Sequence, residues 1–187
     1  LAGSNGSNNS IIIYLINEEG FIDNLNKNEI ITGLESVYGL CMYKSLISKS
    51  TYIFVSDIET LSIYQYRVLN FFPLKTQMVR QIKTSTTSEG CVADDESGIL
   101  YFAQEDEDSG VYFIDAEPND NKVETLDRTT KYNGNIKGDT EGLALFNHPK
   151  GKLLIASSQG SSNFTVYNVS QNKEFIGSFS INKSKKI

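Results

Sequence analysis

Four carboxylate side chains fall at positions from which a single metal site could be built. Two of them stand directly before a glycine, as Glu89 and Glu141, and Tyr38 precedes a glycine in the same way. The three residues follow one another at intervals of 51 and 52 residues. Asp139 lies two residues before Glu141, a step that in a strand puts both side chains on the same side. Glu105, the fourth carboxylate, follows an apolar segment.

Carboxylates held close together repel one another, and their pKa values rise. A hard divalent cation relieves that repulsion, and calcium takes six to eight oxygen ligands from carboxylates, amides and water. The only histidine, His148, stands in a polar turn and is expected to be an ordinary surface residue, so zinc is disfavoured. The alternative is a ring of solvated carboxylates without a metal.

The glycine pairs mark a repeat of β-strands. After each pair come a short apolar segment, a polar turn, a second apolar strand that ends in polar residues, an aromatic strand and a fourth strand. No segment keeps a 3.6-residue period over the length of a helix. Four strands in about 50 residues are typical of a propeller blade. The sequence therefore predicts an all-β fold, a β-propeller of four-stranded antiparallel blades.

The repeat divides the chain into one partial blade and three complete ones. The predicted ranges are 1–33 for the partial blade and 34–85, 86–137 and 138–187 for the others. Propellers use roughly four to eight blades to cover their sheet edges. Three and a half blades are too few, so we expect the chain to be a fragment of one propeller domain.

The propeller predicts which side chains meet. The first strand of each blade lines the central channel, so the equivalent residues Tyr38, Glu89 and Glu141 should face a shared site. Glu105 and Gln159 end the neighbouring strand of their blades and should lie on the same face. We therefore expect a carboxylate cluster drawn from two blades, consisting of Glu89, Glu105, Asp139 and Glu141.

The composition narrows the function classes. A formal net charge of −6 and a pI near 4.9 argue against a nucleic-acid partner, whose phosphates need a basic face. An acidic protein that acts on an anionic substrate would need a cation between them. No apolar run approaches the roughly 20 residues of a membrane-spanning helix.

Two further groups of residues are expected to have structural roles rather than to bind metal. Cys41 and Cys91 show no CxxC or metal-ligand spacing and are expected to be buried, unpaired thiols. The run 94–96 is expected to form an exposed acidic hairpin turn, and 106–108 another, rather than peripheral calcium sites.

Several motifs resemble the β-propeller phytases, in the same order and spacing from about residue 35 to residue 181. They are Ser88-Glu89-Gly90-Cys91-Val92-Ala93-Asp94-Asp95-Glu96, Leu100-Tyr101-Phe102-Ala103-Gln104-Glu105-Asp106-Glu107, Asp115-Ala116-Glu117-Pro118, Asp139-Thr140-Glu141-Gly142-Leu143 and Leu154-Ile155-Ala156-Ser157-Ser158-Gln159-Gly160. The resemblance implies a six-bladed propeller that uses several Ca²⁺ ions to release phosphate from phytate, myo-inositol hexakisphosphate. It also implies export from the cell and a monomer when complete.

The resemblance assigns roles to individual residues. The calcium ligands it implies are Glu89, Glu105, Asp139, Glu141 and Gln159. Glu105 and Tyr38 match catalytic positions, and Tyr38 also contacts substrate. A water activated by the metal would attack phosphorus, without a covalent enzyme intermediate.

The chain departs from the family pattern at two basic positions. Gly6 stands where the family has an arginine, and the segment 57–59 has no basic residue where the family has a lysine. Lys44, Lys49 and Arg67 are candidates to compensate. Two alternative functions remain: a catalytically inactive calcium-binding propeller that binds phytate or a partner, and a calcium-dependent propeller lactonase.

Overall fold

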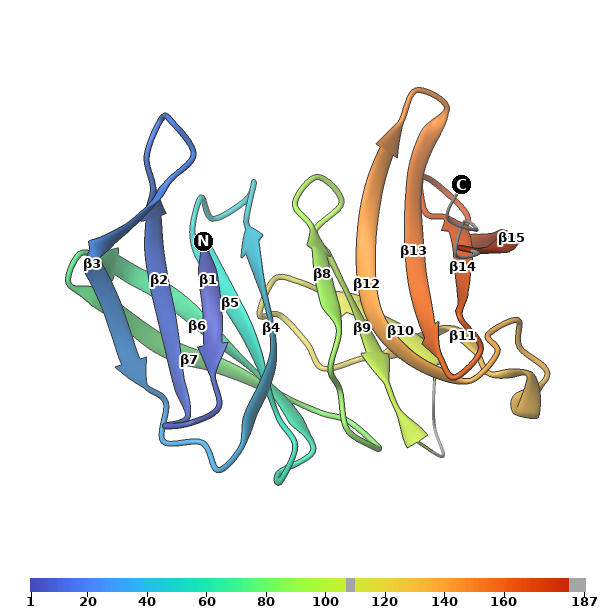
Figure 1. The fold of residues 1–187 in the computed structure, drawn as a ribbon, viewed down its shortest axis with the longest axis horizontal. Coiled ribbons are helices and arrows are strands. Elements are labelled where there is room, and N and C mark those ends of the chain that lie inside the picture. The colour runs from blue at the N-terminus through green and yellow to red at the C-terminus, as the bar shows by residue number, and fades with distance from the viewer. Residues whose placement is uncertain (107–109, 182–187) are drawn as a thin grey trace, which may run out of the picture.

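Four antiparallel sheets follow one another in chain order (Figure 1). The fold comes from a computed structural model that describes residues 1–106 and 110–181 and, for residues 23–27, the backbone alone. Each sheet is an up-and-down meander in which neighbours in sequence are neighbours in space. The predicted all-β propeller class is confirmed. None of the helical turns in this part of the chain has the length and apolar character needed to cross a membrane.

The first sheet has three strands and the other three sheets have four each. The first consists of β1 (Ala2–Asn5), β2 (Ser10–Ile16) and β3 (Ile22–Ile31). The second consists of β4 (Val37–Lys44), β5 (Thr51–Asp57), β6 (Ser62–Phe71) and β7 (Leu74–Lys83). The third consists of β8 (Cys91–Asp94), β9 (Ile99–Gln104), β10 (Gly110–Asp115) and β11 (Glu124–Arg128). The short 3-10 helix η2 (Thr130–Tyr132) leads to the fourth, which consists of β12 (Asp139–His148), β13 (Gly151–Gln159), β14 (Asn163–Asn168) and β15 (Glu174–Ser180).

Apolar side chains fill the spaces between adjacent sheets. One cluster joins the first and second sheets, for example Ile11 with Ile53, and a second joins the second and third, for example Phe54 with Leu100. A third joins the third and fourth sheets. Strand β5 is buried along nearly its whole length because sheets cover both of its faces. The sheets thus pack face to face as blades.

A buried polar network fixes the second blade against the third. The carboxylate of Glu117, which is 6% exposed, accepts hydrogen bonds from the Tyr43 hydroxyl at 2.7 Å and from the Ser45 hydroxyl. Arg80 is also buried, and its guanidinium donates to the backbone carbonyl of Asp115 at 2.9 Å. Burial lowers the pKa of Arg80, against the opposing effect of nearby carboxylates. The turn after β10 is therefore held by side chains of the preceding blade.

The prediction of unpaired thiols is wrong. Cys41 on β4 and Cys91 on β8 form a disulfide, with 5.7 Å between their Cα atoms. The two residues are 50 positions apart, close to the repeat length, so they occupy nearly equivalent positions on the first strands of adjacent blades. That coincidence of spacing was the signal for a disulfide in the sequence.

The prediction for the acidic turn after β8 is also partly wrong. Asp94 is buried, 5% exposed, and accepts hydrogen bonds from Lys152 Nζ at 2.5 Å and Ser97 Oγ at 2.7 Å. Burial alone would raise the pKa of Asp94, but these hydrogen bonds outweigh it and the pKa lies below its usual value. Lys152 also binds the exposed Glu96. An ammonium group from the fourth blade therefore occupies the place between these two carboxylates where a cation could sit.

Candidate metal centre

The predicted site residues gather at one end of the blades, which we call the carboxylate end. Here β4, β8 and β12 begin and β9 and β13 end. Tyr38 lies on β4, Glu89 just before β8 and Glu141 on β12. Glu105 follows the last residue of β9.

Backbone hydrogen bonds tie Glu105 to the segment that carries Glu89. The Glu105 amide donates to the carbonyl of Thr87 at 3.0 Å, and the Thr86 hydroxyl donates to the carbonyl of Glu105 at 2.7 Å. Both carboxylates of the third blade are therefore positioned by one loop, the connection from β7 to β8.

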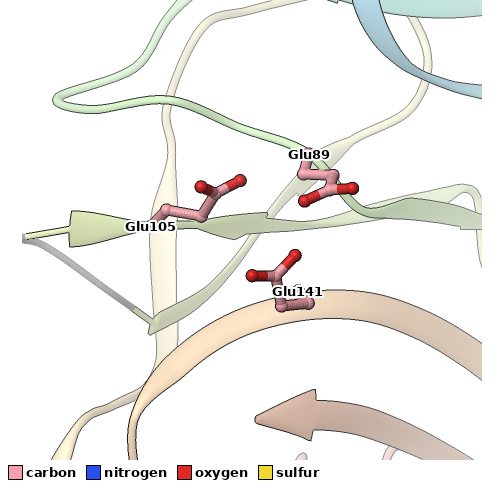
Figure 2. Close-up of side chains that lie close together, drawn as sticks. All are labelled: Glu89, Glu105 and Glu141. Carbon is pink, nitrogen blue, oxygen red and sulfur yellow. The ribbon is translucent and has the colours of Figure 1, made fainter. Parts of the chain in front are cut away.

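Three carboxylates converge at this end. Carboxylate oxygens of Glu89, Glu105 and Glu141 all lie within 4.8 Å of one another, and each residue is partly buried. Figure 2 shows the three side chains pointing toward a common centre. Two blades contribute to the group, as the sequence predicted.

Glycines allow the first strands of the blades to approach closely enough for this convergence. A methyl group at Gly39 would overlap the backbone carbonyl oxygen of Glu89 and lie 2.7 Å from its carbonyl carbon. A methyl group at Gly90 would meet the backbone of Glu141 in the same way. The repeated glycine therefore makes room for the carbonyl group of the equivalent residue in the next blade.

The carboxylates strongly perturb one another. Burial, followed by the charge of Glu89 and a hydrogen bond with it, raises the pKa of Glu105 to about 7. A hydrogen bond with Glu89, followed by burial and the charge of Glu89, raises the pKa of Glu141 to about 7. Hydrogen bonds between two carboxyl groups require a shared proton, so the cluster holds protons near neutral pH when no cation is bound.

The phenol of Tyr38 belongs to the same group. Burial, a hydrogen bond with Glu89 and the charges of Glu89, Glu105 and Glu141 raise the pKa of Tyr38. The side chain remains 41% exposed, so one part contacts the cluster and the rest faces solvent. The Ser4 hydroxyl donates to the Tyr38 carbonyl at 2.6 Å and connects the first blade to this strand.

Asp139 and Gln159 lie beside the cluster rather than within it. They face each other across the β12–β13 pair, and both are exposed. The register shifts between Thr140 and Leu143, so a bulge at Glu141 interrupts the regular alternation between Asp139 and the carboxylate two residues later. The negative charge of Asp139 still contributes to the raised pKa values of Glu105 and Glu141.

The proposed compensation by Lys44, Lys49 or Arg67 is wrong. Strand β4 runs away from the carboxylate end, and the six steps along the chain from Tyr38 to Lys44 cover roughly 20 Å of extended strand. At the far end Lys44 Nζ donates to the Lys49 carbonyl at 2.9 Å, and Arg67 lies beside the same turn, donating to Ser50 Oγ at 3.0 Å. These cations serve a turn at the opposite end of the blade.

The two positions where the resemblance implies a basic residue have structural surroundings of their own. A methyl group at Gly6 would lie 3.5 Å from the Val37 carbonyl oxygen. Asp57 is buried, and its carboxylate accepts backbone hydrogen bonds from Glu35, Ser36 and Glu59. Close to this turn Lys83, which ends β7, donates to the Thr60 carbonyl at 3.3 Å. Sequence reasoning overlooked Lys83, which reaches this turn only through the pairing of β6 with β7.

The donor set fits a hard divalent cation. Glu105 Oε1 is buried and has no hydrogen-bond partner among the described residues, an arrangement that costs free energy unless a cation or water is present. All the groups that converge here offer oxygen, and neither sulfur nor imidazole is among them. Oxygen-only donors with several negative charges are the ligands that calcium prefers.

The chain is similar to known proteins in sequence and in fold. The profile of the family described as Phytase matches residues 1–187. The chain is 32% identical over 194 residues to a 3-phytase from Bacillus subtilis (strain 168). That match covers 100% of this chain and 50% of the relative, so the chain spans about half the length of the curated relative.

A solved structure shares the fold. It is a functionally unknown protein from Desulfotomaculum acetoxidans DSM 771, with a TM-score of 0.59 and 14% sequence identity. The match covers 92% of this chain and 51% of that protein. At this level of identity the likeness shows the architecture alone.

Proposed function

Because the chain belongs to the phytase family, we propose that the protein carrying it is a calcium-dependent phosphomonoester hydrolase that releases phosphate from phytate. The observation that carries this proposal is the convergence of Glu89, Glu105 and Glu141 within 4.8 Å at one end of the blades. Such a group of carboxylates would repel an anionic substrate unless cations lay between them.

Each residue has a role in this proposal. Glu89, Glu105 and Glu141 hold calcium, and Asp139 and Gln159 supply further oxygen ligands from the edge of the cluster. Bound calcium neutralises substrate phosphates and lowers the pKa of a bound water. Glu105 is also the proposed acceptor of a proton from the attacking water; its pKa of about 7 belongs to the calcium-free cluster, and a bound cation would lower it and keep the carboxylate ionised. The exposed part of Tyr38 would contact the bound substrate beside the cluster.

A catalytically inactive propeller is the second candidate. Asp57, next to the position of the missing lysine, is fully engaged by backbone amides, and Gly6 offers no side chain. Such a protein would bind calcium and phytate without releasing phosphate.

Phosphate release separates these functions. We expect the full-length protein to release inorganic phosphate from phytate with calcium present and to lose this activity with excess chelator. Restoring calcium should restore it. Calcium binding without release would identify the inactive propeller, and opening of a sugar lactone without release would identify a lactonase.

We also propose that the protein acts outside the cytoplasm and as a monomer. The disulfide between Cys41 and Cys91 supports the first point, since such bonds persist in oxidising compartments. Millimolar calcium is available there as well.

The effect of calcium on stability should depend on pH. The carboxyl pKa values of Glu105 and Glu141 are raised from 4.5 to about 7 in the folded protein. Without calcium, the protonated cluster therefore adds stability below pH 4.5, and this contribution is lost as the pH rises through about 7. Calcium binds the deprotonated carboxylates, so the stability that calcium adds to the folded protein should increase as the pH rises.

We expect the rise in melting temperature on adding calcium to be small at about pH 5.5 and much larger at about pH 8.5. Differential scanning calorimetry with and without calcium measures it. A rise that is the same at both pH values would contradict the proposed coupling between proton release and calcium binding.

A further inference from the structure

The boundary between the second and third blades crosses the candidate site and carries a covalent link. Strands β4 and β8 belong to different sheets, so no backbone hydrogen-bond ladder joins them. Between them lies the disulfide from Cys41 to Cys91. The same two strands bring Tyr38 and Glu89 together at the carboxylate end.

The disulfide lies close to the pair it would position. Cys41 follows Tyr38 by three residues, and Cys91 follows Glu89 by two. In extended chain these separations are roughly 7 to 10 Å. Between the disulfide and the Tyr38–Glu89 pair, the backbone of Gly39 packs directly on the carbonyl of Glu89. Any separation of the strands at the disulfide would therefore move Tyr38 away from Glu89.

The next blade boundary has no such link. The residues at the corresponding offsets are Val92, three after Glu89, and Leu143, two after Glu141. Both pack against the apolar cluster between the third and fourth blades. The boundary between the second and third blades, where Tyr38 meets Glu89, thus has a covalent bond in the place where the boundary between the third and fourth blades has an apolar contact.

We propose that the Cys41–Cys91 disulfide is a positioning element of the calcium site, and this inference rests on the proposed function. The disulfide holds β4 against β8 and so keeps the Tyr38 hydroxyl beside the Glu89 carboxylate, to which we infer that it donates a hydrogen bond. That hydrogen bond orients Glu89 toward the cation. Partners that orient a metal ligand in this way raise metal affinity, and their removal costs about 10- to 100-fold.

Calorimetric titration of the full-length protein with calcium tests the proposal, at a temperature well below the melting point of every variant. The variants are Cys41→Ser with Cys91→Ser, Tyr38→Phe, and all three substitutions together. We expect the serine pair and Tyr38→Phe each to weaken calcium binding by about tenfold. Because both act through the same hydrogen bond, the triple variant should be no weaker than either alone.

A second pair of substitutions separates the covalent bond from packing. The variant Cys41→Val with Cys91→Leu has the same apolar residue types as the next blade boundary. Because these side chains restore apolar packing, this variant should stay folded even if the serine pair unfolds. Weakened calcium binding in this variant supports the proposal. Native affinity in it, or native affinity in the serine pair despite a lower melting temperature, means that the disulfide is only a structural crosslink, which overturns the proposal.

The same measurements distinguish failure of the proposed function from failure of the positioning role. If the native, oxidised protein binds no calcium, both the function and the positioning role are wrong. If all variants bind calcium equally and phosphate release continues, only the positioning role is wrong.

Discussion

Replacing Glu105 by glutamine should lower calcium-dependent phosphate release from phytate by at least about 100-fold. Glutamine keeps the size of the side chain but removes both the negative charge and the ability to accept a proton. Glu105 lies within 4.8 Å of Glu89 and Glu141, and its buried Oε1 has no hydrogen-bond partner among the described residues. The substitution therefore removes a ligand and the proposed general base together. Initial rates of phosphate release at saturating calcium measure the effect.

The loss should arise at the site rather than from unfolding. Removing one of several mutually repelling carboxylates relieves repulsion, so without calcium the variant should melt at or above the native temperature. Glu19→Gln is a matched control, since Glu19 is exposed in the turn between β2 and β3. A Glu105→Gln enzyme with near-native rates would show that the carboxylate cluster is not the reaction centre.

The repeat explains why so much of the fold and site could be predicted. Blades pack on copies of themselves, so the spacing of Tyr38, Glu89 and Glu141 in sequence becomes proximity in space. The same reasoning correctly placed Glu105 at the end of a strand that terminates beside them. These predictions needed only the period and the direction of the strands.

The errors arose where packing between blades decides the outcome. The bulge at Glu141 shifts its register relative to Asp139, and the same irregularity occurs at Tyr38-Gly39 on β4, so the repeated glycine was the signal for it in the sequence. Asp94 has the composition of an exposed turn, yet Lys152 from the next blade pairs with it. Lys44 and Arg67 lie at the turn around Ser50, at the opposite end of the second blade from the carboxylates, a position that the repeat period alone does not reveal.

Gly39 should be nearly irreplaceable, and Gly39→Ala should lower the free energy of unfolding by about 3 kcal/mol, the upper part of the usual range for overpacking. The new methyl group would overlap the carbonyl oxygen of Glu89 and lie 2.7 Å from its carbonyl carbon. These are backbone atoms, so the clash is relieved only if β4 moves away from the segment that carries Glu89. Calcium affinity should fall as well, because that movement separates Tyr38 from Glu89.

Chemical denaturation of the full-length protein measures the change in stability, with Gly3→Ala as the control. Gly3 lies on β1, and a methyl group there would meet no atom within 4 Å, so its replacement should change stability by less than about 0.5 kcal/mol. The contrast between the two isolates the close approach of the blades from the general cost of replacing a strand glycine. Equal stabilities for Gly39→Ala and Gly3→Ala would mean that the blades can separate without loss. The glycine repeat would then have no role in bringing the carboxylates together.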